Sequence, residues 1–402
     1  MQDPNLKSHP LGGRILTAPV AILTVLALAG LYYVAKRYYF GIGAVANINP
    51  GYPWGIWVAV DVIVAPAIGT GGLAIALLIY AFNQGKYHPL MRPALLGAAL
   101  GYSLDGVAVL IDLGRYYNAV NLLLPWRVNP TSIMLMTGLC LMAYVAVLWI
   151  ELSPVILQRV GLDRMRSFIE RYMFVPIALG IVLAIMHQSA LGTILTVNQL
   201  KLSPLWWTQW LPLLYLISAI AMGYSVVAFE ATLVNRGLGL RAKLPLLTSI
   251  SHLTFRLVAA FLIIRIGVIV INGNLGLAFE PTREALLFWV ETALFVAGLA
   301  TIATDRLRRT ERYIFLSACA LLLAGTFYRL DSYLIAYRGT PGWQYFPSVP
   351  ELIITIGLIS LHILVFILFC KLLPVYSIPS TRRTEAITKS EAGSDSTATV
   401  PS

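Results

Sequence analysis

Acidic side chains and a histidine stand inside the most apolar stretches of the chain. Asp61 lies within the run WGIWVAVDVIVAP, and His187 lies in an apolar run as part of MHQS. An ionisable side chain that faces lipid costs at least about 2.5 kcal/mol, so such groups usually face the interior of a helix bundle and mark a pathway or a site. Carboxyl and imidazole groups in that setting can accept and release protons. These two residues therefore predict proton transfer within the apolar part of the protein.

Most of the chain is apolar. Of its 402 residues, 58% are hydrophobic and only 12% are charged, whereas a soluble domain carries about 25% charged residues. A helix needs roughly 20 apolar residues to cross a membrane, and a barrel would show short alternating segments instead. The composition predicts an all-α polytopic membrane protein with about ten transmembrane helices. Their approximate limits are 15–36, 55–83, 93–115, 131–157, 172–198, 209–235, 246–271, 284–304, 313–336 and 349–372.

Positive charge is distributed unevenly between alternate connections. Of the 29 Lys and Arg residues, 19 lie in one set of segments and 7 in the alternate loops. Cytoplasmic loops carry the excess of Lys and Arg, so we expect a multi-pass protein of the inner membrane with both termini in the cytoplasm. The net charge of +11 then lies beside anionic lipid and requires no nucleic-acid partner. The richer segments are 1–14, 84–92, 158–171, 236–245, 305–312 and the C-terminal tail.

The chain divides into one membrane domain and two cytoplasmic ends. The N-terminal end is 1–14, the membrane domain is 15–373, and the C-terminal segment is 374–402. The last segment is polar and low in apolar residues, so it cannot bury enough surface to fold. We expect it to be a disordered cytoplasmic tail.

Many ionisable residues besides Asp61 and His187 lie within the predicted spans. Asp105 lies near the middle of the third span, one turn from Tyr102 on the same face. The half of the spans towards the outside holds Asp61, Asp112, Arg115, His187, Arg265, Glu291, Arg329 and Asp331. The cytoplasmic half holds Glu151, Glu230, His252, Arg256 and, near mid-depth, His362.

Several of these residues have a structural alternative. Arg329 and Asp331, with Arg265 at a similar depth, could form an ion-pair network between helices. Asp112 and Arg115 are three residues apart near the outer interface, so they could pair on one helix face or bind a ligand.

The remaining acidic groups and His187 leave similar choices open. Glu151 and Glu230 each stand about two turns before a cytoplasmic end, where they could reach water or loop cations, or relay protons. His187 could be a satisfied core histidine or a ligand-binding one. Pro66 lacks an N–H, so it should kink its helix and open a pocket beside Asp61.

The chain offers few ligands for a resident metal or haem. Cys140, Cys319 and Cys370 lie far apart without a CxxC pair, which argues against an iron–sulfur cluster or structural zinc held by this chain alone. No predicted helix carries two histidines, and only His252 and His362 could hold a haem between them. We expect no haem, metal or iron–sulfur cluster in this chain.

Several short strings of the chain are shared with a known family. They are PWGIW at 53–57, GTGG at 69–72, YHPL at 87–90, RPAL at 92–95, GYSL at 101–104, DLGRY at 112–116, MHQS at 186–189 and WQYFP at 343–347. In these strings the chain resembles the NrfD / polysulfide-reductase membrane-subunit superfamily, and the likeness runs from Leu11-Gly12-Gly13 to Leu373-Pro374. Within the superfamily it is most similar to the HybB branch, the integral membrane subunits of quinone-linked nickel–iron hydrogenases.

The resemblance implies a fold, a substrate and partners. It implies two pseudo-symmetric four-helix bundles, roughly 55–198 and 209–336, with the first and tenth helices flanking them. It also implies no haem and no metal in this chain, a ferredoxin-like iron–sulfur subunit on the outer face, and menaquinone or ubiquinone as exchangeable substrate in the outer half. One departure concerns the fourth helix: HybB-like sequences can carry a carboxylate in its outer part, where this chain has Leu135-Met136-Thr137.

The resemblance and the buried charges together predict a set of site residues. Reduction of a quinone consumes two electrons and two protons. Asp61 and His187 would supply the protons as catalytic residues, and Glu151, Glu230 and His252 would form the proton pathway to the cytoplasm. The full predicted quinone-binding set is Trp54, Asp61, Tyr102, Asp105, Asp112, Arg115 and His187.

These expectations predict a quinone-binding subunit of a respiratory oxidoreductase complex. The catalytic partner that fits best is a periplasmic nickel–iron hydrogenase, and this chain alone would not act on the primary substrate. One alternative keeps the quinone site in a polysulfide, sulfur-compound or other molybdo- or iron–sulfur complex. The other is a secondary transporter, which the sequence favours less because transporters often show paired broken helices and only the break at Pro66 is visible.

Overall fold

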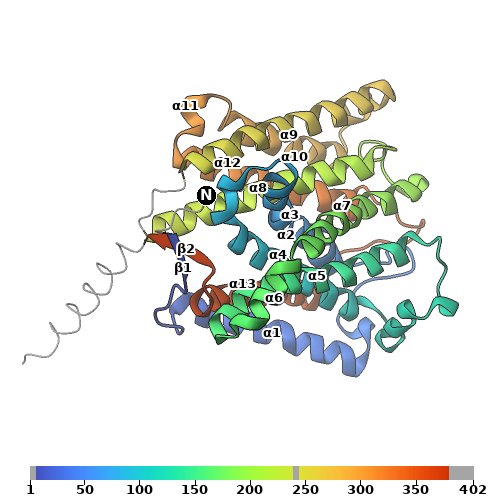
Figure 1. Ribbon diagram of the computed structural model, residues 1–402. Coiled ribbons are helices and arrows are strands. Elements are labelled where there is room, and N and C mark those ends of the chain that lie inside the picture. The colour runs from blue at the N-terminus through green and yellow to red at the C-terminus, as the bar shows by residue number, and fades with distance from the viewer. Residues whose placement is uncertain (1–5, 239–243, 380–402) are drawn as a thin grey trace, which may run out of the picture.

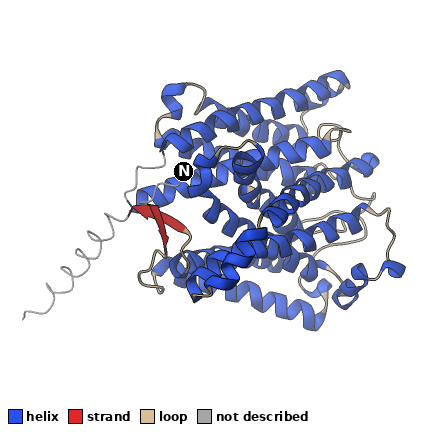
Figure 2. Ribbon diagram, viewed as in Figure 1, coloured by secondary structure: helices blue, strands red, loops and turns tan. Residues whose placement is uncertain are grey.

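Long helices form nearly the whole molecule in the computed structural model, which describes residues 6–238 and 244–379 (Figures 1 and 2). The long α-helices are α1 (Ala18–Phe40), α4 (His88–Asp112), α5 (Ile133–Val160), α7 (Phe174–Val197), α8 (Leu211–Leu238), α9 (Leu244–Ile271), α10 (Arg283–Ala300), α12 (Glu311–Leu330) and α13 (Val349–Leu372). Short α-helices are α2 (Ala65–Gly69), α3 (Gly71–Ala76), α6 (Asp163–Tyr172) and α11 (Asp305–Arg308). Three segments are π-helical: η2 (Val58–Val64), η3 (Leu77–Ala81) and η9 (Asp331–Ile335). The 3₁₀ segments are η1 (Ile42–Ala44), η4 (Gly85–Tyr87), η5 (Tyr116–Leu123), η6 (Pro125–Arg127), η7 (Gln199–Lys201) and η8 (Asn274–Phe279).

The helices confirm the prediction of an all-α, multi-pass membrane protein. In the described part of the chain, nine segments are long and apolar enough to cross a membrane. The predicted run 284–304 forms α10, which is not among the nine. It has 18 residues and carries Arg283, Glu284 and Glu291. The nine spans are Ala18–Phe40, Val58–Ala81, Gly85–Asp112, Ile133–Val160, Phe174–Val197, Leu211–Arg236, Leu244–Ile271, Glu311–Ile335 and Val349–Leu372.

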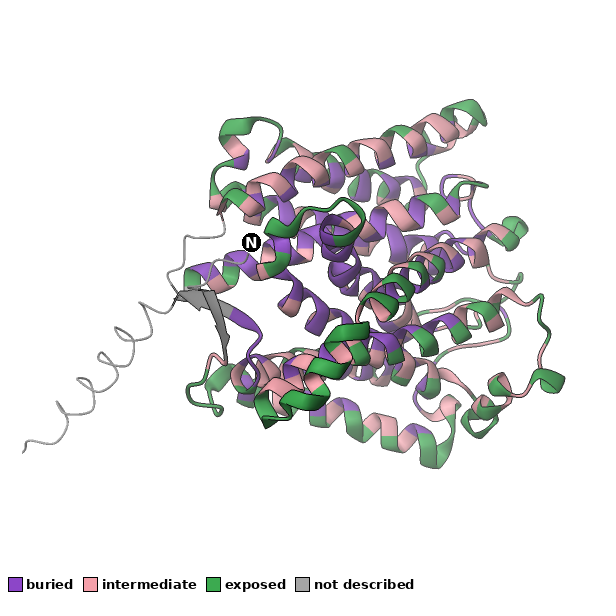
Figure 3. Cartoon of the chain, viewed as in Figure 1, coloured by how far each residue is buried: buried purple, intermediate pink, exposed green. Residues whose placement is uncertain are grey.

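The buried core lies along three spans in the middle of the array. Val58–Ala81, Gly85–Asp112 and Leu211–Arg236 are mostly buried, whereas α1 is mostly exposed (Figure 3). α1 packs along α13, and a Cβ added to Gly30 would lie 2.7 Å from the Cα of Gly357. Glycine at both positions therefore permits this close helix contact. The predicted pseudo-symmetry of two four-helix bundles stays a prediction.

The second span is broken, as Pro66 predicts. The π-helical segment η2 leads into α2, whose first turn contains Pro66, and α2 ends at Gly69, so that Thr70 separates it from α3. Thr70 Oγ1 donates to the carbonyl oxygens of Ala67 at 2.6 Å and Ala219 of α8 at 2.5 Å. A Cβ on Gly223 would lie 2.6 Å from the Thr70 carbonyl oxygen. The broken span is thus held against the middle of α8, which satisfies backbone groups that a regular helix would satisfy itself.

Two faces close the ends of the helix array. The first, called here the long-loop face, is formed by 41–57, 113–132, 198–210, 272–282 and 336–348. The opposite end, called here the sheet face, holds α6, α11 and a two-stranded antiparallel sheet in which β1 (Leu6–His9) pairs with β2 (Tyr376–Pro379) (Figure 1). Residues 376–379, which composition assigns to an unstructured tail, therefore belong to a strand. Residues 380–402 of the predicted tail lie outside the described residues.

A buried carboxylate connects segments 41–57 and 336–348 of the long-loop face with α13. Glu351 is fully buried at the first turn of α13. Its oxygens accept hydrogen bonds from the Asn47 N–H at 2.7 Å, the Ser348 N–H at 3.1 Å and the Tyr345 hydroxyl at 2.8 Å. The Tyr345 oxygen in turn accepts from the Ile56 N–H at 2.7 Å. Burial, and after it the hydrogen bond to Glu351 and the charge of Glu351, raises the pKa of the Tyr345 phenol. The phenol therefore stays neutral and donates its hydrogen bond to this carboxylate.

Loss of this carboxylate is expected to destabilise the protein. Glu351→Ala would remove three hydrogen bonds from partly exposed donors to a buried charged acceptor, and a hydrogen bond to a charged group contributes about 1.5–3 kcal/mol. We expect a destabilisation of about 3 kcal/mol or more, seen as a lower unfolding temperature of the detergent-solubilised protein by tryptophan fluorescence. Glu280→Ala is the control, because Glu280 is an exposed carboxylate on the same face. Equal unfolding temperatures for the two variants would contradict this role for Glu351.

Candidate functional site

Asp61 lies at the centre of the π-helical segment η2 with its side chain sealed from solvent. The residue is 0% exposed, and neither carboxylate oxygen has a hydrogen-bond partner within the described residues. Asp105 of α4 is close enough to interact with it electrostatically. A π-helical turn is an irregularity that recurs at functional sites. The structure thus places the predicted carboxylate in the core of the broken span.

Asp105 and His187 meet across two helices. Asp105 Oδ2 of α4 lies 3.5 Å from His187 Nε2 of α7, and both side chains are 0% exposed. One turn before Asp105, the Tyr102 ring packs edge-on against the His187 ring at a centroid distance of 5.5 Å. The Tyr102 oxygen accepts a hydrogen bond of 2.9 Å from Gln188 Nε2. Asp61, Tyr102, Asp105 and His187 form one group, called here the acid–histidine cluster.

The acid–histidine cluster contains several polar atoms without hydrogen-bond partners. Both oxygens of Asp61, both oxygens of Asp105 and both ring nitrogens of His187 lack one among the described residues. A buried polar group left without a partner costs about 1–3 kcal/mol, and native proteins rarely tolerate this without a functional reason. The cluster therefore offers buried donor and acceptor atoms that can exchange protons. Sequence analysis did not name Gln188, although it directly follows His187 in MHQS.

Three members of the predicted set lie apart from this cluster. The structure does not pair Asp112 with Arg115: the helix ends at Asp112, and Arg115 is exposed in the loop that follows. Asp112 Oδ1 instead accepts from Trp57 Nε1 at 3.0 Å. Trp54 Nε1 donates to the Tyr333 carbonyl oxygen at 2.9 Å, which ties it to the second half of the chain.

The predicted pathway glutamates lie between helices in half-buried positions. Glu151 of α5 faces α7, because a Cβ on Gly180 would lie 2.5 Å from its Oε1. Glu230 of α8 faces α4, where a Cβ on Gly97 would lie 3.7 Å from its Oε1. Neither glutamate takes part in an ion pair within the described ranges. Their proton-relay role stays a prediction.

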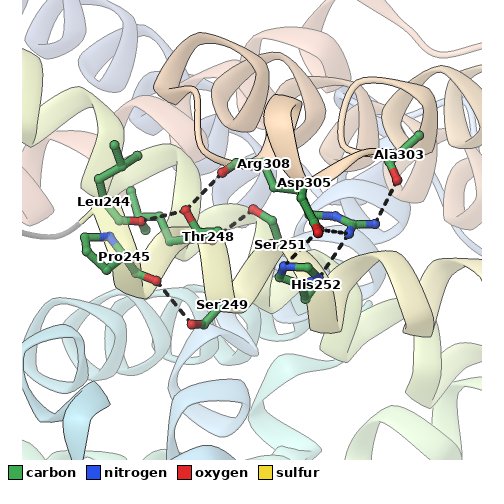
Figure 4. A network of polar contacts seen from close by, with 10 residues as sticks. Leu244, Pro245, Thr248, Ser249, Ser251, His252, Ala303, Asp305 and Arg308 are labelled. Carbon is green, nitrogen blue, oxygen red and sulfur yellow. Dashed lines mark hydrogen bonds and ion pairs between the residues drawn. The ribbon is translucent and has the colours of Figure 1, made fainter.

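His252 belongs to a separate polar network at the sheet face (Figure 4). Its Nε2 lies 3.5 Å from Asp305 Oδ1, and its Nδ1 lies 3.0 Å from Arg308 Nη1. The His252 side chain is 41% exposed, and Arg308 also donates to the Ala303 carbonyl oxygen at 3.1 Å. This network anchors the connection between α10 and α12 to α9. His252 therefore lies at the sheet face and apart from the acid–histidine cluster, and its place in the proton pathway stays a prediction.

The buried charges of the second half pair differently from the predicted network. Arg265 of α9 forms a buried ion pair with Glu291 of α10. Arg329 and Asp331 take part in no ion pair among the residues that the structure describes, although both are buried. The expected network of Arg265, Asp331 and Arg329 is therefore only partly present: Asp331 is close enough to interact electrostatically with Arg265, but the direct ion pair of Arg265 is with Glu291, and Arg329 joins no ion pair among the described residues.

Comparison with known proteins identifies relatives along most of the chain. The family described as "Polysulphide reductase, NrfD" matches residues 44–340. The "Probable Ni/Fe-hydrogenase 2 b-type cytochrome subunit" of Escherichia coli (strain K12) is 37% identical over 372 residues, which cover 91% of this chain and 94% of that protein. The "Menaquinone reductase, integral membrane subunit" of Nitratidesulfovibrio vulgaris is 25% identical over 223 residues, which cover 52% of each chain.

The first relative's name includes a b-type cytochrome, which raises the question of haem ligands in this chain. Histidine is a common axial ligand of haem iron. His252 has both ring nitrogens engaged by Asp305 and Arg308, and α9 packs against α8, α10 and α12, whereas α13 with His362 packs against α1 and α4. The described residues contain no group of three or more His, Cys, Asp or Glu that could hold a metal ion. His252 and His362 therefore do not fit the two axial positions of a bis-histidine haem.

Proposed function

The chain belongs to the polysulphide reductase NrfD family, and from that premise we propose that it is the quinone-binding membrane subunit of a respiratory oxidoreductase complex. We propose a periplasmic nickel–iron hydrogenase as the catalytic partner and menaquinone as the quinone. The relatives named for a hydrogenase and for a menaquinone reductase support these choices. The observation that carries the proposal is the acid–histidine cluster, a buried set of proton-exchanging groups in which Asp105 faces His187 and Asp61 has no hydrogen-bond partner among the described residues.

The chemistry assigned to the cluster is proton supply. A quinone becomes a quinol when its two oxygens gain two protons and the ring system gains two electrons. Asp61 and His187 would each hydrogen-bond one quinone oxygen and donate a proton to it. Asp105, 3.5 Å from His187 Nε2, would orient the imidazole and stabilise its charged form. Glu151 and Glu230 would return protons to the cluster from the cytoplasm.

Electrons would enter from the long-loop face, which we assign to the periplasmic side, with both termini in the cytoplasm. A cleft of about 690 Å³ opens there between segments 47–49 and 342–346, with Arg283 at its edge. Tyr345 lines this cleft and also accepts the Ile56 N–H hydrogen bond. Ile56 precedes Asp61 by only five residues of helix, which is little more than one turn. An iron–sulfur subunit docked at this cleft would therefore lie near the acid–histidine cluster.

Purification of the intact complex tests this function. The tagged chain, extracted in mild detergent, is expected to bring down a ferredoxin-like iron–sulfur subunit and a nickel–iron hydrogenase large subunit, identified by mass spectrometry. The complex should reduce a soluble menaquinone analogue with H₂. A molybdoenzyme among the co-purifying subunits would replace the hydrogenase assignment with another respiratory complex. Recovery of the chain without redox subunits would contradict the proposal.

One observation favours a second candidate, a secondary transporter. Both halves of the chain contain an irregular membrane segment, η2 in the first and η9 in the second, and transporters often bind ions at paired broken helices. A transporter would move solute or ions into proteoliposomes that contain this chain alone. Proton or sodium uptake under those conditions would favour this function over quinone reduction.

A further inference from the structure

Arg329 is a buried arginine that connects the two halves of the chain. It lies in the last turn of α12 and is 0% exposed. Its Nη1 donates to the Ile63 carbonyl oxygen of η2 at 3.1 Å. Its Nη2 donates to the Tyr215 carbonyl oxygen at 2.8 Å and to Ser218 Oγ at 3.3 Å, both on α8. A single guanidinium thus holds the broken second span against α8.

The charge of Arg329 is not balanced by a neighbouring carboxylate. Among the described residues no Asp or Glu oxygen lies within 4.0 Å of it, and its Nε has no hydrogen-bond partner. Arg265, by contrast, is buried in the same half as an ion pair with Glu291. A buried unpaired charge is costly. A buried arginine that is paired with a carboxylate costs less folding free energy than an unpaired one. The unpaired charge of Arg329 therefore requires an explanation other than stability.

The contacts of Arg329 lead to the acid–histidine cluster along two routes. Ile63, whose carbonyl oxygen it binds, follows Asp61 by two residues in the same π-helical turn. The guanidinium is also close enough to interact electrostatically with the Tyr102 side chain. Arg329 Cζ lies 4.6 Å from the centroid of the Tyr215 ring, and this contact orients the guanidinium. Arg329 therefore acts on both the backbone that carries Asp61 and the tyrosine that packs on His187.

We propose that Arg329 is a positioning residue for quinone reduction, which fixes the π-helical turn of Asp61 and directs a positive charge towards the Tyr102 side of the cluster. This inference rests on the proposed function. Preorganised positive charge favours the negative charge that the oxygens of a carbonyl substrate acquire during reduction. Because Arg329 acts on geometry and charge rather than on binding, its loss should lower kcat and leave KM nearly unchanged.

The test compares two substitutions in membranes that contain the assembled complex. Arg329→Lys keeps the charge but cannot bind both carbonyls in the same fork geometry, and Arg329→Met removes charge and hydrogen bonds. With H₂ as donor and a soluble menaquinone analogue as acceptor, kcat should fall about 10-fold for Arg329→Lys and about 100-fold for Arg329→Met, as expected for a small misplacement of catalytic groups. KM should stay within about threefold of wild type, a difference of less than about 0.7 kcal/mol.

Arg37→Lys is the matched control. Arg37 is also buried and its guanidinium also donates to a backbone carbonyl, that of Leu113, but at the long-loop end of α1. It should keep kcat within about twofold of wild type, because the substitution is placed away from the chemistry. If Arg329→Met fails to assemble, the kcat and KM of Arg329→Lys decide alone.

Coupling to Asp61 provides the second readout. Asp61→Glu lengthens the side chain by one methylene group. The carboxylate then no longer occupies the position that the π-helical turn bound by Arg329 gives it. Arg329→Lys should then lower kcat by less than about twofold in the Asp61→Glu background, a non-additivity expected for residues that act as a unit. Unchanged kcat in Arg329→Lys, or a raised KM at unchanged kcat, would overturn the positioning role. If Asp61→Asn also kept full quinone reduction, the acid–histidine cluster would not be the proton source and the positioning role would fail with it, whereas a wild-type complex that does not reduce the menaquinone analogue would contradict the proposed function itself.

Discussion

Asp61→Asn is expected to abolish quinone reduction by the assembled complex while dye reduction by its partner continues. Asparagine has the size of aspartate but cannot carry a proton, and loss of a positioned proton donor costs about 10²–10⁴-fold. We therefore expect H₂-dependent reduction of a menaquinone analogue to fall by at least about 100-fold. Reduction of benzyl viologen with H₂ should stay within about twofold, because this dye takes electrons from the partner without a quinone site.

Asp331→Asn is the matched control for Asp61→Asn. Asp331 is also a buried carboxylate in a π-helical segment, but it lies in the second half of the chain. The same change of chemistry there should leave quinone reduction within about threefold of wild type, since it removes no proton donor of the cluster. Equal losses in both variants would mean that any buried carboxylate is needed for folding, and Asp61 would then have no special role.

The membrane spans were predictable because their signal is local. A run of about 20 apolar residues specifies a spanning helix irrespective of its neighbours, so limits such as 349–372 agree with the observed Val349–Leu372. The broken second span was predictable from Pro66, because proline lacks the N–H that a helix needs. The strand pairing of residues 376–379 with β1 was not, because it joins segments at the two ends of the chain that composition describes as merely polar.

The candidate site was only partly predictable, because its geometry depends on contacts between distant segments. Asp61 and His187 stand out as ionisable residues in apolar runs, and spacing brings Tyr102 to the face of Asp105. Spacing failed for Arg115, because the helix ends before the residue completes an i,i+3 pair with Asp112. The bond from Arg329 to the Ile63 carbonyl joins positions 266 residues apart. A single sequence contains no signal for such a contact.

His187 and Asp105 are expected to act as a unit, which a double substitution can measure. His187→Gln should lower the kcat of quinone reduction by about 100-fold, the effect of losing a proton donor. Asp105→Asn should lower it by at least about 10-fold, because Asp105 acts through the imidazole that it faces at 3.5 Å. The double variant should be no slower than His187→Gln alone, since residues of one catalytic unit are strongly non-additive.

His362→Gln is the control that distinguishes a specific role of Asp105 and His187 from a general requirement for polar side chains within the membrane spans. His362 is half-buried on α13, where a Cβ on Gly101 would lie 3.6 Å from its Cε1, and it should keep kcat within about threefold of wild type. Losses that multiply in the double variant would show that Asp105 and His187 serve separate steps, with Asp105 exchanging its own proton. Because both side chains are fully buried, the comparison also requires equal yields of assembled complex, so that kcat reports proton delivery rather than the amount of folded subunit.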